Sequence, residues 1–510
     1  MRDLLFLSHR IPYPPDKGDK IRSWHMFQHL ARRFRMHLGC LVDDPDDVAW
    51  IEELRPLCVD LACIAIDPRL QRLKALLRAR PGQPLTLGYF HDARLQRWVN
   101  ATLAHHAIQH VFVYSSAVAH YVMRAPRSTA DGAPGWEPMV EPRAGLEGGQ
   151  GAGPEAGPRL GLQAGSVRVL DMVDVDSAKW TAYAATASWP ARAVFAREGR
   201  TLLAFERRAA RAFSRSIFVN EAEWRHFVEL APEARAHTGW VENGVDLAHF
   251  SPMLAFADPF PPMEGANGTA MEQPIAPPMG RPTERPGGPP TGPSTGAPID
   301  THPGSPAGAP TGNPGAPKLV FTGHMGYRPN IDAVTWFARA VMPALRERLP
   351  GARFAIVGAA PAPEVLRLAD LPGVIVTGRV ADTRPWLAHA SIVVAPLLIA
   401  RGTQNKVLEG MAMARPVIAT PEAFEGVQAV PGQDILLASG VEETIARITD
   451  VLSGRHPGLG AAGRRAVELR HDWPVTLARL DALFPEDPVP DRPSANAGGL
   501  GVPQPPEVGR

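Results

Sequence analysis

The sequence predicts an α/β protein made of two doubly wound domains, each a parallel sheet covered by helices on both faces. Short β-branched apolar runs alternate with amphipathic stretches of helical period both before residue 250 and after residue 317, which is the pattern of βα units. A segment rich in proline and glycine separates the two series. The chain has 510 residues, enough for two cores.

The first series predicts a domain over residues 1–250. A strand at residues 4–7 is followed by an amphipathic helix at residues 18–33. Further strands are expected at residues 36–42, 59–66, 110–114, 167–173, 216–219 and 238–241. One stretch, about residues 125–165, holds too few apolar side chains to join a core, so we expect a disordered insertion there.

The second series predicts a domain over residues 317–484, after a disordered Pro/Gly-rich linker at residues 252–316. Its strands are expected at residues 318–323, 352–357, 374–376, 392–395 and 416–419, with helices at 331–349, 441–452, 460–469 and 474–483. The proline-rich residues 485–510 are expected to be a disordered tail. Open sheets of this kind bind ligands outside the carboxyl ends of their strands, so the loops at those ends are the candidate site.

The composition and the missing motifs exclude several classes of function. A net charge of +1 gives no global footprint for nucleic acid. No apolar run could span a bilayer and no signal-peptide profile precedes the first strand, so a cytoplasmic protein is expected. The chain has no G-x-G-x-x-G after a strand, no Walker A loop and no G-x-S-x-G. No cofactor is expected, and because His105, His106 and His110 lack metal-ligand spacing, no metal is expected either.

Residues 401–415 are the most informative segment, because they read as a polar turn and a short helix between two strands. The N-terminus of such a helix binds anions through free backbone N–H groups. Gly402 allows a phosphate to approach closely, and Thr403 is the expected N-cap. The polar face of the helix carries Asn405, Lys406 and Glu409. Glu409 lies roughly 9 Å along the helix from Thr403, where a carboxylate could accept hydrogen bonds from a vicinal diol.

Three other loops follow predicted strands. In residues 8–20, Gly18 opens a helix whose free N–H groups can meet an anion, with Lys17 beside it. Arg328, after the first strand of the second domain, could reach a diphosphate as a bidentate donor. Residues 377–382, which include Arg379 and Val380, could hydrogen-bond a nucleobase edge through their backbone.

A basic, leucine-rich helix is expected at residues 70–80. Its arginines and lysine surround four leucines, so it could touch an anionic membrane surface. A solvated amphipathic helix is the simpler interpretation and remains the preferred one.

Several different short motifs lie along the second domain, at residues 321–323, 329–330, 356–358, 376–378, 395–396, 406–413, 416–417 and 425–427. Together they resemble glycosyltransferase family 4, the retaining nucleotide-sugar transferases of the GT-B fold. Residues 12–23 and 174–180 resemble a narrower branch, the bacterial sugar transferases of exosortase and PEP-CTERM exopolysaccharide systems.

The resemblance implies a GT-B fold, in which two Rossmann-like domains face each other across a cleft and the C-terminal one binds the nucleotide. It implies that Glu409 holds the ribose, while Arg401 stands where the broad family has a first glutamate, as in a variant site. The expected nucleotide and diphosphate site comprises Gly18, Arg328, Arg379, Val380, Arg401, Gly402, Thr403, Asn405, Lys406 and Glu409. The candidates for catalysis, by position, are Asp19, Ser115 and Asp176.

The implied reaction is retaining, metal-independent transfer of a sugar from a UDP- or GDP-linked donor. The implied acceptor is a saccharide or a polyprenyl-linked saccharide of bacterial exopolysaccharide biosynthesis, reached in the cytoplasm or at the cytoplasmic face of the inner membrane. Two alternatives stay open. One is a GT-B nucleotide-sugar epimerase, and the other is a non-catalytic GT-B-shaped scaffold of a polysaccharide assembly complex.

Overall fold

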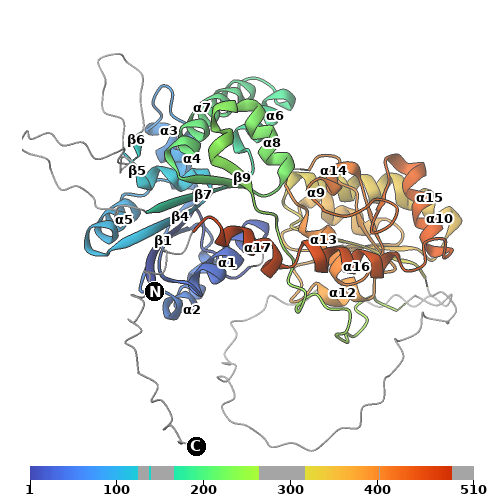
Figure 1. Ribbon diagram of the computed structural model, residues 1–510. Coiled ribbons are helices and arrows are strands. Elements are labelled where there is room, and N and C mark those ends of the chain that lie inside the picture. The colour runs from blue at the N-terminus through green and yellow to red at the C-terminus, as the bar shows by residue number, and fades with distance from the viewer. Residues whose placement is uncertain (16, 125–136, 139–165, 263–315, 401, 485–510) are drawn as a thin grey trace, which may run out of the picture.

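The protein is described by a computed structural model that covers residues 1–15, 17–124, 137–138, 166–262, 316–400 and 402–484 (Figure 1). The expected Pro/Gly-rich segment at 263–315, the tail at 485–510 and almost all of the expected insertion at 125–165 lie outside these residues. Arg401 lies outside them as well.

The N-terminal sheet is parallel throughout, with strand order β3-β2-β1-β4-β7-β8-β9. Its strands are β1 (Arg2–Ser8), β2 (Phe34–Val42), β3 (Asp60–Ala65), β4 (Ile108–Tyr114), β7 (Val167–Val173), β8 (Arg215–Phe218) and β9 (Thr238–Trp240). Its helices are α1 (Gly18–Ala31), α2 (Ile51–Leu54), α3 (Pro68–Leu77), α4 (Leu85–Tyr89), α5 (Ala93–His105), α6 (Asp176–Thr186), α7 (Ala191–Ala212) and α8 (Glu221–Leu230). Two further short strands, β5 (Met123–Arg124) and β6 (Glu137–Pro138), pair in the antiparallel direction.

The strands of this sheet are apolar on both faces because helices cover both. Along β1, Leu5 and Leu7 join the core formed with α5 and α7, whereas Leu4 and Phe6 join the core formed with α1. Figure 1 shows α6, α7 and α8 on one side of the sheet and α1 on the other. The βα alternation of the sequence therefore predicted this domain correctly.

The C-terminal sheet is also parallel, with order β12-β11-β10-β13-β14-β15. Its strands are β10 (Lys318–Thr322), β11 (Arg353–Val357), β12 (Val374–Gly378), β13 (Ile392–Ala395), β14 (Val417–Ala419) and β15 (Leu436–Leu437). Its helices are α9 (Arg328–Trp336), α10 (Met342–Arg348), α11 (Pro363–Leu366), α12 (Arg384–Ala388), α13 (Asn405–Ala412), α14 (Pro421–Phe424), α15 (Gly440–Leu452) and α16 (Leu459–Arg470). The helix expected at 331–349 is continuous from α9 to α10 through a π-helical segment, Phe337–Val341.

The last helix, α17 (Trp473–Asp481), packs on the N-terminal domain and not on the domain that precedes it. Trp473 and Leu477 join the hydrophobic core that contains α1. Asp481 pairs with His29 on α1 and with Arg33, two residues after the end of that helix. The predicted end of the C-terminal domain at residue 484 is therefore wrong. A helix was correctly expected at residues 474–483, but only the tertiary contacts reveal which domain it covers.

The predicted linker also begins too early. Of residues 252–316, the first eleven are described, and Phe260 is buried against Trp386 of the C-terminal domain with ring centroids 5.0 Å apart. Asp258 forms an ion pair with Lys318 at the start of β10. This segment therefore packs on the C-terminal domain, because one aromatic side chain and one charge anchor it there.

The chain passes between the domains twice, first after β9 and again between α16 and α17. A hydrogen bond joins this first crossing to the second. Val245 donates its N–H to the carbonyl of His471 at 2.7 Å. The carboxyl ends of both sheets face the space between the domains, where the loops after the strands meet. Within the described part of the chain, no helix combines the length and the apolar character that crossing a membrane requires.

Candidate functional site

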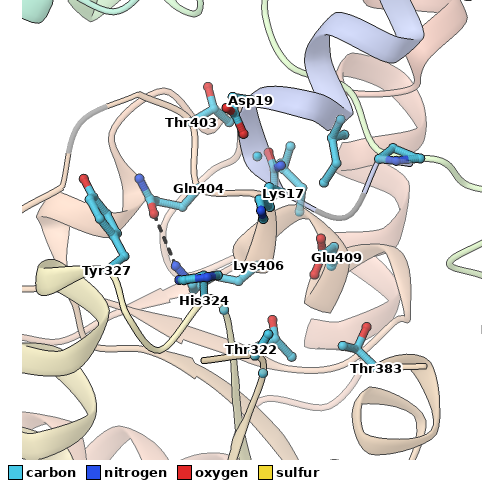
Figure 2. Close-up of a pocket in the computed structure, with 18 of the residues that line it drawn as sticks. Lys17, Asp19, Thr322, His324, Tyr327, Thr383, Thr403, Gln404, Lys406 and Glu409 are labelled. Carbon is cyan, nitrogen blue, oxygen red and sulfur yellow. Dashed lines mark hydrogen bonds between the residues drawn. The ribbon is translucent and has the colours of Figure 1, made fainter. Parts of the chain in front are cut away.

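One cleft, with a volume of about 1320 Å³, lies between the two domains. The N-terminal domain lines it with residues that follow β1, β4 and β7, and the C-terminal domain with residues that follow β10, β11, β12 and β13. Figure 2 shows Lys17 and Asp19 of the first domain around the same cavity as Lys406 and Glu409 of the second. The cleft therefore lies where open parallel sheets bind their ligands.

The helix α13 supplies one wall of this cleft. It begins at Asn405, and its N-cap is Gln404, which makes no side-chain capping bond. The expected cap, Thr403, is wrong, because its hydroxyl donates to the carbonyl of Gly426 at 3.3 Å. The N–H groups of the first turn are left without a side-chain cap, so this end of α13 can receive an anion.

Lys406, in the first turn of α13, is a buried cation. Its ammonium donates to Oδ1 of Asn330 at 3.1 Å and to Oε1 of Gln404 at 3.4 Å, the latter drawn in Figure 2. It also lies 5.0 Å from the centroid of the Phe321 ring. Burial lowers the pKa of Lys406 to about 8, although the charge of Glu409 opposes this shift. An anionic ligand would return the electrostatic stabilisation that burial removes.

Glu409 lies one turn further along α13, on the wall of the cleft. Burial raises the pKa of its carboxyl to about 7, while Lys406 acts in the opposite direction. A carboxyl with this pKa changes charge near neutral pH. The charges of Glu409 and Lys406 therefore both depend on the pH near neutrality and on whether a charged ligand is bound.

The helix α1 approaches α13 from the opposite domain. A Cβ placed on Gly18 would lie 3.9 Å from Nδ2 of Asn405. Nδ2 of Asn243, in the first crossing between the domains, donates to Oδ1 of Asn405 at 3.3 Å. The N-cap of α1, Lys17, makes no side-chain capping bond. Two helix N-termini from different domains therefore meet at one side of the cleft, and both favour negative charge.

Asp19, also in the first turn of α1, is held as a carboxylate. Oδ2 of Asp19 accepts from Nη1 of Arg10 at 2.9 Å and lies 3.6 Å from Nε2 of His9. Burial favours the neutral carboxyl, but His9 and Arg10 outweigh it and hold the pKa of Asp19 well below its usual range. Arg10 also pairs with Asp43 at 2.9 Å. Asp19 is therefore suited to orienting a ligand and not to donating a proton near neutral pH.

Asp176 belongs to an ion-pair cluster at the start of α6. Nζ of Lys179 lies 2.8 Å from Oδ2 of Asp174 and 3.0 Å from Oδ1 of Asp176. Burial of Lys179 disfavours its positive charge, but the two carboxylates outweigh burial and raise the pKa of Lys179 well above its ordinary value. Beneath them, the buried Glu206 accepts from the N–H and the hydroxyl of Ser177 at 3.1 and 2.5 Å. The cluster is thus fixed from below and presents its charged atoms to the cleft.

Ser115 lines the cleft at the end of β4 with a left-handed backbone, φ 81°. Its hydroxyl oxygen accepts from the N–H of Ala117 at 3.3 Å, which caps the 3-10 helix Ser116–Val122. This bond gives Ser115 a structural role at the rim of the site.

The remaining expected site residues divide between the cleft and its surroundings. Arg379 and Val380 line the cleft, as expected. Arg328 is largely exposed and pairs with Asp332 at 2.6 Å and Glu364 at 3.1 Å, away from the lining residues. The prediction that Arg328 faces the cleft is therefore wrong, since two nearby carboxylates hold its side chain on the outer surface.

Gly402 acts through its backbone at the domain boundary. Its φ is +69°, and an added Cβ would lie 2.7 Å from Oδ1 of Asp174. A side chain at this position would separate the loop before α13 from the start of α6. Gly402 is not itself among the lining residues, whereas the next two residues, Thr403 and Gln404, line the cleft.

Several lining residues were missed by the sequence predictions. They are His9, Arg10, Asp174, Lys179, Thr322, His324 and Tyr327. The loop after β1 was recognised for Gly18, but nothing in its local pattern shows that His9 and Arg10 turn toward Asp19. Lys179 lies three residues after Asp176 on α6, so the two side chains share one face of that helix. No helix was expected at these residues, and the pairing was therefore missed.

Comparison with known proteins agrees with this geometry. Residues 316–453 match a family model described as glycosyl transferases group 1. No curated protein matches the sequence. Among solved structures, sucrose-phosphate synthase from Thermosynechococcus elongatus is similar with a TM-score of 0.56 and 15% identity, over 95% of this chain and 98% of that one.

Two further structures extend the comparison. HepE from Anabaena, solved in complex with UDP and glucose, has a TM-score of 0.54 and 12% identity, over 94% of this chain and 99% of that one. WaaG, a glycosyltransferase involved in lipopolysaccharide biosynthesis, has a TM-score of 0.50 and 12% identity, over 95% of this chain and 100% of that one. The fold is GT-B. Its C-terminal half contains the matched domain, and that half supplies Lys406 and Glu409 to the cleft.

Proposed function

We propose that the protein is a glycosyltransferase that moves a sugar from a nucleotide-sugar donor to an acceptor hydroxyl. The observation that carries this proposal is the convergence of two helix N-termini and the buried Lys406 on one side of the cleft. A diphosphate is the group that such an arrangement binds best, since it accepts hydrogen bonds from backbone N–H groups and carries negative charge. The match of residues 316–453 to the group 1 glycosyl transferases supports the same activity.

The proposed donor lies along α13. The diphosphate would rest at the start of the helix beside Lys406, and the ribose diol would reach Glu409 one turn further in. The base would lie near the backbone of Arg379 and Val380, which line that end of the cleft. A uridine diphosphate sugar is the first candidate, because the similar structure of HepE was solved with UDP and glucose. The guanosine nucleotide remains the second candidate.

The largest electrostatic demand of the reaction is the charge that develops on the departing nucleoside diphosphate. Lys406 and the free N–H groups of α1 and α13 would stabilise it, so we propose that transfer proceeds without a divalent cation or a cofactor. We further propose that the configuration at the anomeric carbon is retained. Asp19, fixed by Arg10, and the cluster of Asp174 and Lys179 would orient the transferred sugar and the acceptor.

A surface of the N-terminal domain supports contact with a membrane, and hence a lipid-linked acceptor. On α3, Leu70, Leu73, Leu76 and Leu77 are 48%, 52%, 61% and 77% exposed. The same helix and the residues after it carry Arg69, Arg72, Lys74, Arg78 and Arg80. Nη2 of Arg197 on α7 donates to the carbonyl of Arg80 at 2.9 Å, which joins this surface to the α6–α7 region. There Trp189 is 83% exposed.

Exposed leucines between basic side chains are typical of helices that lie in the interface of an anionic bilayer. We therefore propose that α3 docks on the cytoplasmic face of a bacterial inner membrane. The resemblance of residues 12–23 and 174–180 to exosortase-associated sugar transferases supports a polyprenyl-linked saccharide of exopolysaccharide biosynthesis as the acceptor.

The membrane proposal is tested by co-sedimentation with vesicles that contain anionic phospholipid. We expect the double variant Leu73→Glu and Leu77→Glu to abolish co-sedimentation. The matched control is Leu469→Glu, because Leu469 is also 69% exposed but lies on α16 of the other domain. Equal recovery of the parent protein, the double variant and the control variant with the vesicles would overturn the assignment to α3.

The activity is tested in two steps with the full chain. A thermal-shift panel of nucleotide sugars, with uridine and guanosine diphosphate sugars first, identifies the donor. The selected donor, labelled in its sugar, is then incubated with lipid-linked and free saccharide acceptors. We expect label in the acceptor, release of the nucleoside diphosphate in equal amount, undiminished turnover in excess chelator and retained anomeric configuration by NMR.

The alternatives give different results in the same experiment. An epimerase would convert the nucleotide sugar with no acceptor present. A scaffold would bind the nucleotide sugar but transfer it to none of the acceptors. Either result would overturn the proposed transferase activity.

A further inference from the structure

A second group of ligating side chains lies in the N-terminal domain, outside the residues that line the cleft. It consists of His37, Asp60 and His106. One ring nitrogen of each histidine and one carboxylate oxygen of Asp60 all lie within 4.8 Å of one another. The three residues are far apart in the sequence, which is why no metal-ligand spacing was visible there.

The sheet and one helix bring these residues together. His37 on β2 and Asp60 at the start of β3 are register partners in a parallel pair, so their side chains leave the sheet on the same face. His106 is the C-cap of α5, which covers that face of β2. The packing is close, since a Cβ on Gly39 would lie 2.5 Å from the ring of Trp98 on α5. The ring centroids of His37 and His106 are 4.5 Å apart.

Two of the three ligands, His37 and Asp60, are oriented by further hydrogen bonds. Nε2 of His37 donates to Oδ1 of Asp3 at 3.3 Å, because an ionised carboxylate can only accept. Asp3 is itself paired with Arg35 at 2.6 Å. Oδ2 of Asp60 accepts from Nε1 of Trp98 at 2.8 Å, and its Oδ1 accepts from the N–H of Leu61 at 2.9 Å. A carboxylate behind a histidine and hydrogen bonds to a ligating carboxylate are the usual outer partners of metal ligands.

The bond to Asp3 leaves Nδ1 of His37 with a lone pair and no proton. This atom is buried and has no hydrogen-bond partner among the residues that the structure describes. His37 itself is fully buried, with 0% exposure. A buried polar atom without a partner costs free energy, and in this position a cation would provide the missing partner.

We propose that His37, Asp60 and His106 bind a divalent transition-metal ion, with Zn²⁺ as the best fit. Two imidazoles and one carboxylate are a common ligand set for zinc, whereas Mg²⁺ and Ca²⁺ require mostly oxygen ligands. Ligand atoms about 2.1 Å from zinc lie about 3.4 Å apart in a tetrahedral site, so the cluster must contract slightly. Asp60 and His106 are only half-buried, so they can close on the ion and leave its fourth position to water.

Such an ion would link β2, β3 and the end of α5, so it would stabilise the N-terminal domain without entering the proposed reaction. Its role is therefore independent of the glycosyltransferase proposal. Loss of zinc binding and loss of sugar transfer are separate results that can be measured on the same preparation.

The test uses the full chain, free of any histidine tag and treated with a chelator. Zn²⁺ is titrated in competition with a chromogenic chelator, and thermal unfolding is measured with and without the ion. We expect one tightly bound equivalent with a dissociation constant in the micromolar range or below, and a rise in Tm of several degrees. Co²⁺ in place of Zn²⁺ should give the visible absorption of a four-coordinate site, and Mg²⁺ should have no effect.

Two variants decide whether the binding occurs at this cluster. His106→Gln replaces a half-buried ligand and should abolish stoichiometric binding and the rise in Tm. The matched control is His105→Gln, which changes the preceding, exposed residue of the same helix and should leave both unchanged. Asp60→Asn should weaken binding at least tenfold while preserving the bond from Trp98. Binding of less than a tenth of an equivalent to the parent protein, or equal binding by His106→Gln, would overturn the proposal.

Discussion

Replacing Glu409 by alanine tests the proposed ribose contact most directly. The carboxylate of Glu409 lies on the cleft wall one turn from the start of α13. A hydrogen bond to a charged group contributes about 1.5–3 kcal/mol, so Glu409→Ala should raise the Kd for the nucleoside diphosphate about 10- to 150-fold. Isothermal titration calorimetry at pH 8 measures this change with the carboxyl mostly ionised.

The pH dependence gives a second signature with a defined sign. Burial raises the pKa of Glu409 to about 7, so lowering the pH protonates the carboxyl and removes a hydrogen-bond acceptor from the ribose. Between pH 8 and pH 6 its ionised fraction falls about tenfold, and affinity should fall with it. Burial lowers the pKa of Lys406 to about 8, so above that value the cation is lost and binding of the diphosphate should weaken. The affinity should therefore be highest between pH 7 and 8.

Two variants separate these effects. Glu409→Gln keeps the size of the side chain but cannot ionise, so the loss of affinity on the acidic side should disappear. Glu422→Ala is the matched control, because Glu422 is an exposed glutamate of α14 that does not line the cleft. Unchanged affinity of Glu409→Ala at pH 8, or a loss equal to that of Glu422→Ala, would refute the ribose assignment.

Three further outcomes follow from buried groups of the fold. Lys406→Met should weaken UDP binding by about 2 kcal/mol, the value of a charged hydrogen bond, but leave uridine binding unchanged by calorimetry; equal losses would contradict a diphosphate contact. Burial raises the pKa of Glu206 from 4.5 to about 8. The stability that the neutral carboxyl contributes is therefore fully present below about pH 4.5 and is lost as the pH rises through 8, a change on the order of 5 kcal/mol. Urea unfolding of Glu206→Gln should accordingly show a flatter pH profile than the parent protein, and an identical slope would contradict this. Trp473→Ala should cost about 3–5 kcal/mol of unfolding free energy, because Trp473 is 4% exposed and stacks on His25 with centroids 4.4 Å apart; a loss below about 1 kcal/mol would contradict its place in the N-terminal core.

The sequence was informative where local pattern and chemistry agree. The βα alternation predicted both sheets, because a strand buried on two faces is apolar throughout and a covering helix is amphipathic. The segment after β13 predicted a short helix whose polar residues include Lys406 and Glu409, and both line the cleft. These predictions needed only the helical period and the rule that ligands bind at the carboxyl ends of strands.

The sequence was less informative where the outcome depends on a partner distant in the chain. The strand before Arg328 was correctly expected, but the sequence does not show where the side chain of Arg328 points. That orientation is decided by Asp332 and Glu364, with which it pairs on the outer surface. The helix α17 was correctly expected too, yet its apolar face covers the domain formed at the other end of the chain. Periodicity reveals that a face is apolar, but not which surface it covers.

The position of Asn243 explains why the cleft needs both domains in one arrangement. Its Oδ1 accepts from Nη1 of the buried Arg22 at 3.0 Å, and its Nδ2 donates to Asn405 at the start of α13 at 3.3 Å. Its carbonyl accepts from Nδ1 of His471 at 3.0 Å, since Nε2 of that ring already accepts from the N–H of Gln428. Burial lowers the pKa of His471, so the neutral ring can hold both bonds near neutral pH. Asn243, in the first crossing, thus bonds to the core of the N-terminal domain, to the second crossing and to the proposed diphosphate site. A change in the angle between the domains must strain or break at least one of these bonds.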